Sequence, residues 1–77
     1  MQPITPGIYK HYKGGMYEVI GIGRDEATLE QVVVYNMLYD TEDFPMGSLW
    51  VRPLLRFTED IEVDGVVVPR FSRVSDV

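Results

Sequence analysis

The sequence predicts a mainly β fold, a small SH3-like barrel of five or six strongly bent antiparallel strands with one short helical turn. Three observations lead to this prediction. Residues 31–39 form a long run of β-branched, aromatic and aliphatic side chains without glycine or proline. Shorter strand-like segments on either side of it are separated by glycine-containing turns. The pair Asp64-Gly65, between valines, is the signature of a two-residue hairpin.

The run at 31–39 is the element around which we expect the chain to fold. Its apolar side chains occupy both parities: Val32 and Val34 alternate with Val33 and Tyr35. A strand that is apolar on both faces is usually covered on both faces. The pattern therefore predicts a strand in the middle of the sheet, within one domain that spans residues 1–77.

The segments before this run predict a hairpin. Residues 7–12 and 16–22 alternate as strands, and Lys13-Gly14-Gly15 between them is a turn that tolerates positive φ. Gly21 and Gly23 inside the second strand indicate a bulge or a sharp bend. We interpret residues 1–7 as a lead-in and the polar residues 24–30 as a loop.

The segments after the run predict a loop, a strand and a helical turn. Residues 40–47 form the longest loop, in which Phe44 either folds back on the core or stands exposed. A short strand at 48–52 ends at Pro53, and residues 53–58 suit one helical turn because Leu54 and Phe57 are three residues apart.

The C-terminal third of the chain predicts a second hairpin and a frayed end. The strands at 61–68 turn at Asp64-Gly65, and Pro69 ends the second one. Phe71 is expected to dock on the core, and residues 72–77 are expected to fray.

Composition restricts the possible functions. Seven basic residues against twelve acidic ones give a net charge of −5, which argues against nucleic-acid binding because that affinity depends on basic side chains. The chain has no cysteine, which excludes disulfides and thiolate ligands and favours the cytoplasm. We find neither a signal peptide nor an apolar run long enough to span a membrane.

The chain resembles a bacterial family of small proteins called domain of unknown function 1653. The most specific segments are Tyr9-Lys-His-Tyr-Lys-Gly14 and Trp50-Val-Arg-Pro53; others are Tyr17-Glu-Val19, Glu26-Ala-Thr-Leu-Glu30, Val34-Tyr35, Leu38-Tyr39 and Val68-Pro-Arg-Phe71. The resemblance implies an SH3-type barrel. The family has no established activity, so the resemblance assigns no catalytic residue. The chain departs from the family pattern mainly in the loop 40–47, which is longer here.

The sequence contains no strong catalytic or cofactor motif. His11 is the only histidine, and no serine lies in a nucleophile elbow. Gly21-Ile-Gly23 lacks the third glycine of a dinucleotide site, since position 26 is Glu. The carboxylates show no metal-binding spacing, and we predict neither a cofactor nor a metal.

The aromatic side chains are the best functional signal, because small barrels often bind extended ligands in an aromatic groove. Our first hypothesis is a noncatalytic module that binds a protein segment or a small ligand. The expected binding residues are Tyr9, His11, Tyr12, Lys13, Tyr35, Trp50 and Arg52. If Trp50 faces the core, Arg52 does too, and we then expect Arg52 to have a carboxylate partner.

Two alternatives stay open. The first is a small enzyme in which His11 is a general base, Glu18 orients it and Arg52 stabilises an anion. The second is a structural oligomerisation domain in which the strands at 61–68 extend the sheet into a dimer. The expected state is a monomer or a weak homodimer.

Overall fold

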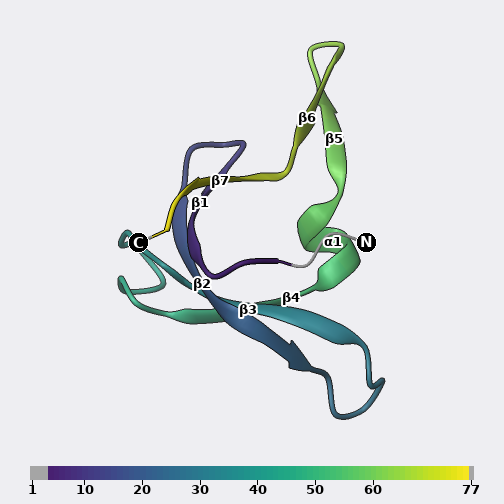
Figure 1. The fold of residues 1–77 in the computed structure, drawn as a ribbon. Helices are drawn as coiled ribbons and strands as arrows, with labels where there is room; N and C mark the ends of the chain where they lie inside the picture. Colours follow the sequence, from purple (N-terminus) through teal and green to yellow (C-terminus); the bar gives the residue numbers. More distant parts are fainter. Residues whose placement is uncertain (1–3, 77) are drawn as a thin grey trace.

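The computed structural model describes residues 4–76 and confirms a mainly β fold with one short helix (Figure 1). Within these residues, seven strands and one helix follow one another. In order they are β1 (Gly7–His11), β2 (Met16–Arg24), β3 (Gln31–Met37), β4 (Leu49–Pro53), α1 (Leu54–Thr58), β5 (Asp60–Val63), β6 (Val66–Pro69) and β7 (Phe71–Ser75).

The strands form two antiparallel sheets. Five of them pair in the order β4-β3-β2-β1-β7, and β5 pairs with β6 alone. Figure 1 shows the five-stranded sheet curling around an interior, with α1 on its open side and the β5–β6 hairpin projecting away. Strand pairing does not close a barrel within residues 4–76. The strand β3 has a partner on each side, as predicted for 31–39, although β2 holds the central position.

The predicted hairpin of β1 and β2 is confirmed. In its turn, the amide of His11 donates to the carbonyl of Gly15 at 2.8 Å, and Gly14 takes a positive φ of 110°. The glycine bend is also confirmed, because the β2–β3 register runs from Val19 opposite Tyr35 to Gly21 opposite Val34. The extra residue between them reverses the alternation of β2, which curves the sheet at this point.

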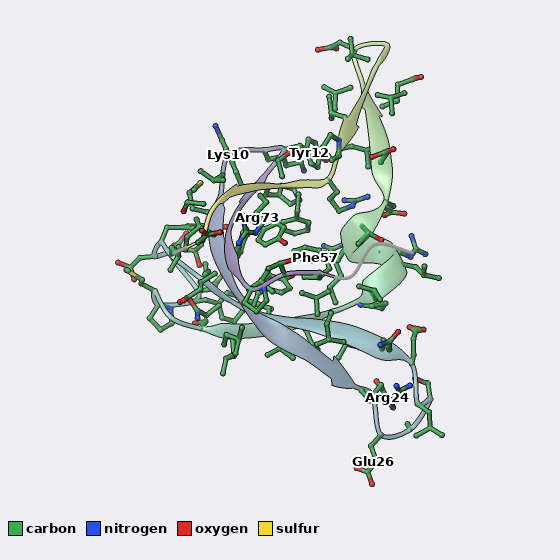
Figure 2. The ribbon with its side chains drawn as sticks, viewed as in Figure 1. Lys10, Tyr12, Arg24, Glu26, Phe57 and Arg73 are labelled. Atoms are coloured by element: carbon green, nitrogen blue, oxygen red, sulfur yellow. The ribbon has the colours of Figure 1, made fainter. Side chains whose placement is uncertain are left out.

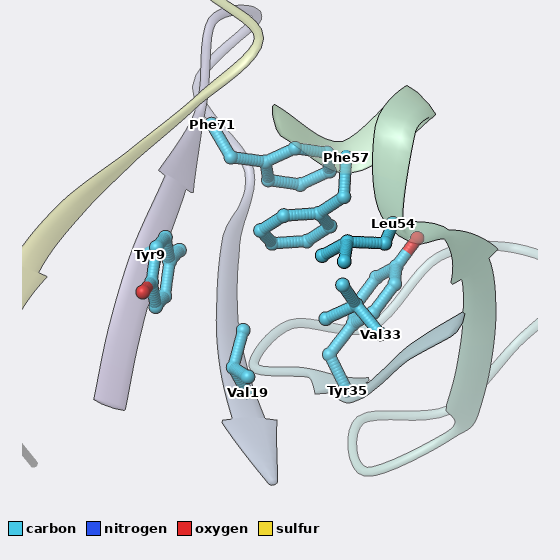
Figure 3. Packing of buried hydrophobic residues seen from close by; sticks show 7 residues of the cluster. All are labelled: Tyr9, Val19, Val33, Tyr35, Leu54, Phe57 and Phe71. Carbon is cyan, nitrogen blue, oxygen red and sulfur yellow. The ribbon is translucent and has the colours of Figure 1, made fainter. Parts of the chain in front are cut away.

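The core lies on the concave face of the five-stranded sheet and is rich in aromatic rings (Figure 3). Leu54 and Phe57 of α1 point into it, as their spacing predicted, and Phe57 is only 1% exposed. The ring of Phe57 stacks on that of Phe71 with centroids 4.1 Å apart. The buried cluster consists of Tyr9, Val19, Val33, Tyr35, Leu54, Phe57 and Phe71.

The C-terminal third follows the prediction at its hairpin but not at its end. Asp64 and Gly65 have φ of 51° and 80°, the left-handed conformations that the predicted turn requires. The expected fraying of residues 72–77 is wrong for most of that segment, since β7 pairs with β1 along its length. Residue 77 lies outside the described residues. The polar side chains of β7 carry no strand signal, and backbone pairing with β1 determines its structure.

No helix within residues 4–76 has the length and apolarity that would be needed to cross a membrane.

Candidate ligand-binding trough

The residues expected to bind a ligand lie in different environments. Tyr9 and Tyr35 belong to the core, with 6% and 7% of their surface exposed. His11, Trp50 and Arg52 are half-buried, whereas Tyr12 and Lys13 are exposed. Tyr9 is occupied by core contacts: its hydroxyl donates to the carbonyl of Thr5 at 2.8 Å and its ring packs edge-on against Phe57. We therefore leave Tyr9 out of the candidate site.

Two adjoining hollows bring several of the other residues together. The turn-side hollow, of about 530 Å³, is lined by His11, Lys13, Gly14, Gly15, Met16, Tyr17, Leu38 and Tyr39. The tryptophan-side hollow, of about 250 Å³, is lined by Tyr17, Tyr35, Met37, Tyr39, Thr41, Phe44 and Trp50. Tyr17 and Tyr39 line both hollows, so we describe the two as one aromatic trough. Tyr12 lies outside it, in a separate hollow beside the β5–β6 hairpin.

A pair of tyrosines separates the two halves of the trough. The hydroxyl oxygens of Tyr17 and Tyr39 are 2.6 Å apart and share a hydrogen bond. Burial and this hydrogen bond raise the pKa of Tyr17 above its usual value, so its hydroxyl stays protonated at physiological pH. One hydroxyl donates to the other, which leaves the second hydroxyl proton free to donate to a ligand.

The far wall of the trough consists of Trp50 and the loop 40–47. The indole nitrogen of Trp50 lies 3.3 Å from the sulfur of Met37, and Phe44 packs edge-on against the Trp50 ring at 4.9 Å. The loop is held by its own hydrogen bonds, since the amide of Met46 donates to a carboxylate oxygen of Asp40 at 2.6 Å. Phe44 thus folds back on the sheet while its outer surface stays exposed.

His11 forms the opposite end of the trough as a neutral side chain. Its Nδ1 accepts the amide hydrogen of Lys13 at 3.2 Å, which leaves the proton on Nε2. Burial lowers the pKa of His11, and the charges of Arg52, Arg70 and Lys13 lower it further. The ring also contacts Phe71 edge-on at 4.9 Å.

Arg52 points to the same side of β4 as Trp50, but its surroundings differ from the expected ones. Trp50 pairs with Tyr35 and Arg52 with Val33, two positions of β3 that face the core. Within residues 4–76, Arg52 has no carboxylate in ion-pair contact. Its guanidinium lies instead over the ring of Phe71, 5.7 Å from the centroid. The prediction that Arg52 has a carboxylate partner is therefore wrong.

The structure does not bring Glu18 next to His11, as the enzyme hypothesis requires. Cross-strand partners share a face of a sheet, and Tyr9 pairs with Tyr17 whereas Ile8 pairs with Glu18. His11 has the parity of Tyr9, so Glu18 lies on the opposite face and cannot orient it. Over residues 4–76, no cluster of three or more histidine and acidic side chains is placed to hold a metal ion.

The binding residues predicted from the sequence do not include Tyr17, Tyr39 or Phe44, which line the trough. A signal for Tyr17 existed in the sequence: a hairpin that turns at 13–15 places Tyr17 opposite Tyr9, on the core face of the sheet. Tyr39 and Phe44 lie beyond the end of β3 and have no strand alternation that could have located them.

Two comparisons with known proteins, one with family models and one with solved structures, match the chain to the same family. The family model described as "Protein of unknown function (DUF1653)" matches residues 7–73. A crystal structure of a DUF1653 protein from Bordetella bronchiseptica is 38% identical in sequence, with a TM-score of 0.87, and the alignment covers 100% of this chain and 95% of that one. None of the curated proteins compared with the chain matches it.

Proposed function

The chain belongs to the DUF1653 family, and we propose that this member is a noncatalytic binding module whose ligand occupies the aromatic trough. The observation that carries the proposal is the pair of adjoining hollows that share Tyr17 and Tyr39. The ligand would be a protein segment or a small molecule with an apolar part. Ligand sites are typically concave, mostly apolar and aromatic, with a few polar groups that fix orientation.

The packing of the trough supports this role. Tyr17 contacts the rings of Tyr35, Tyr39 and Phe71 edge-on, which fixes its orientation. A fixed aromatic wall loses little conformational freedom on binding, and this favours affinity.

We also propose, from the curl of the five-stranded sheet, a relation to SH3-like barrels, which bind extended ligands in aromatic grooves. The lack of cysteine supports a cytoplasmic location.

Amide chemical-shift mapping tests the proposal. The labelled protein would be titrated with pools of metabolites, nucleotides and short peptides. We expect the shifted amides to cluster at residues 11–17 and 37–50. The variant Trp50→Ala should abolish the shifts, whereas Leu49→Ala, an exposed neighbour in β4, should leave them intact. Shifts confined to another surface, or shifts that survive in Trp50→Ala, would contradict the proposal.

We also propose a weak homodimer through the β5–β6 hairpin as a second role. Val66 and Val67 of β6 are 59% and 64% exposed, and no other strand of residues 4–76 pairs with the outer edges of this two-stranded sheet. Asp60, Glu62 and Asp64 on the same hairpin oppose tight self-association by like-charge repulsion. Light scattering at rising protein concentration tests this role: a mass that stays monomeric removes it, and loss of a dimer in Val67→Lys supports it.

A further inference from the structure

The charges around the turn-side hollow are opposite in sign to the charge of the whole protein. The chain carries twelve acidic residues and a net charge of −5. Among residues 4–76, no carboxylate lines either hollow of the trough, and the charged residue that lines the turn-side hollow is Lys13. A cationic lining in an acidic protein repels cations and attracts anions at close range.

Arg52 adds a second positive charge, and no carboxylate of residues 4–76 forms an ion pair with it. The ring of Phe71 separates it from the hollow, since Phe71 contacts both His11 and Tyr17. Arg70 and Arg73 differ from it, because they form ion pairs with Glu59 and Asp76 at 2.9 Å and 2.7 Å. A half-buried guanidinium without a carboxylate is costly unless another acceptor reaches it.

The neutral polar groups of the turn-side hollow also donate hydrogen bonds. The Nδ1 of His11 is occupied by the Lys13 amide, so Nε2–H is the free group of the imidazole. The tyrosine pair has one hydroxyl proton left over after its internal hydrogen bond. Lys13 also lines this hollow, and its ammonium lies over the Tyr12 ring beside it, 5.7 Å from the centroid. Because the Lys13 side chain is exposed and flexible, its ammonium can turn toward the two neutral donors, and the three groups together complement an oxyanion.

We propose that the ligand of the trough carries a carboxylate or phosphate group that binds in the turn-side hollow between Lys13 and His11. Its apolar or aromatic part would extend past the tyrosine pair to Trp50. Arg52 lies behind the ring of Phe71 and stabilises the anion by long-range electrostatic attraction. This inference rests on the proposed binding function and specifies the chemistry of the ligand.

Small probes of matched shape test the inference on the full chain. 4-Methylbenzoate and phenyl phosphate are the anionic probes, and 4-methylbenzamide is the neutral one. We expect the anions to shift the amides of Lys13, Gly14 and Gly15 and to bind about tenfold more tightly than the amide. Their affinity should fall as sodium chloride is raised. The tighter of the two anions identifies the preferred oxyanion.

Three variants locate the charge that matters. Lys13→Gln and Arg52→Gln should each weaken the anions by about five- to tenfold and leave the neutral probe unchanged. Lys10→Gln is the matched control, because Lys10 is an exposed lysine of the same hairpin and points outward from β1 (Figure 2). Lys13 is exposed, so its variant keeps the test valid if Arg52→Gln fails to fold.

The outcomes separate this inference from the function on which it rests. If the neutral probe shifts the trough amides as strongly as the anions do, the inference that the ligand carries an anionic group is wrong. The proposal of an aromatic binding module is then still supported. Equal weakening by Lys10→Gln and Lys13→Gln would also overturn the inference, since the attraction would then come from overall charge. If no probe shifts the trough amides, the inference is wrong. The titration with pooled metabolites, nucleotides and peptides then tests the binding function independently.

Discussion

The curled five-stranded sheet and the β5–β6 hairpin are built from similar residues but are held together differently. Strands β1, β2 and β3 each have partners on both sides, and their concave face buries the aromatic core. In the part of the chain that the structure describes, β5 and β6 pair only with each other, and none of their residues is fully buried. An isolated two-stranded hairpin is marginally stable in water. The strongest local turn signal in the sequence therefore marks the part of the fold with the least tertiary support.

The variant Phe57→Ala should have the largest effect, because it removes a ring from the centre of the five-stranded body. We expect the free energy of unfolding to fall by about 3–5 kcal/mol, which is enough to unfold most of a domain this small. Urea denaturation followed by circular dichroism measures it. Phe57→Leu, which retains part of the volume, should lose only about 1–2 kcal/mol. Val67→Ala in the hairpin is the control and should change little, since Val67 is mostly exposed. An effect of Val67→Ala as large as that of Phe57→Leu would remove the contrast between the two regions.

The variant Gly65→Ala should perturb the hairpin alone. Gly65 has a φ of 80°, and a Cβ there would meet no atom within 4 Å, so the cost is purely conformational. We expect a loss of about 1–2 kcal/mol in the local stability of the hairpin, seen as faster amide hydrogen exchange within 60–69.

Gly21→Ala is the matched control for Gly65→Ala. Gly21 also has open space around it but no positive φ, so alanine should be tolerated there. Faster exchange in β1 or β3 of Gly65→Ala would mean that the hairpin and the body unfold together.

The ion pair of Arg70 and Glu59 links the two arms of the hairpin at its base, and its removal should have a smaller effect. Arg70 donates from Nη2 at 2.9 Å and from Nε at 3.2 Å to one oxygen of Glu59. Because both side chains are partly exposed, Glu59→Gln should cost about 0.5–1 kcal/mol in urea denaturation and less at high salt. Asp76→Asn, which removes an ion pair at the exposed end of β7, should change nothing measurable. A salt-independent loss in Glu59→Gln would assign the effect to packing.

Protonation of His11 should have the smallest effect. Its pKa is lowered in the folded protein by burial and by Arg52, Arg70 and Lys13. The unfolded chain therefore binds more protons just below the ordinary histidine pKa of about 6.5. The contribution of His11 to stability is present above that pH and is lost as the pH falls through the lowered pKa.

Unfolding free energies measured between about pH 7 and pH 5 test the titration of His11. The wild-type protein should lose more stability over this range than His11→Gln does. Identical slopes in the two proteins would contradict the lowered pKa.

The sequence predicted the elements that depend on local chemistry. Asp64-Gly65 located one hairpin, the Lys13-Gly14-Gly15 turn located the other, and Leu54 with Phe57 located the helical turn. The strand β7 was missed because its pairing with β1 joins segments more than sixty residues apart. No local pattern encodes a partner at that distance.

The candidate site could be predicted only in part, for a related reason. The structure places His11, Lys13 and Trp50 along one concave surface and Tyr9 in the core, and the binding role of the first three stays a prediction. Strand parity could not separate these roles, because the bulge after Val19 reverses the alternation of β2 and the curl of the sheet brings Arg52 over Phe71. Both features depend on the completed sheet.

The position of Trp50 gives the trough an optical property of its own. The sequence contains a single tryptophan, and its indole forms one wall of the tryptophan-side hollow, between Phe44 and the sulfur of Met37. The intrinsic tryptophan emission of the whole protein therefore arises from this one surface. A molecule that displaces water from the indole changes the wavelength and intensity of that emission, so the unlabelled, unmodified chain reports its own occupancy.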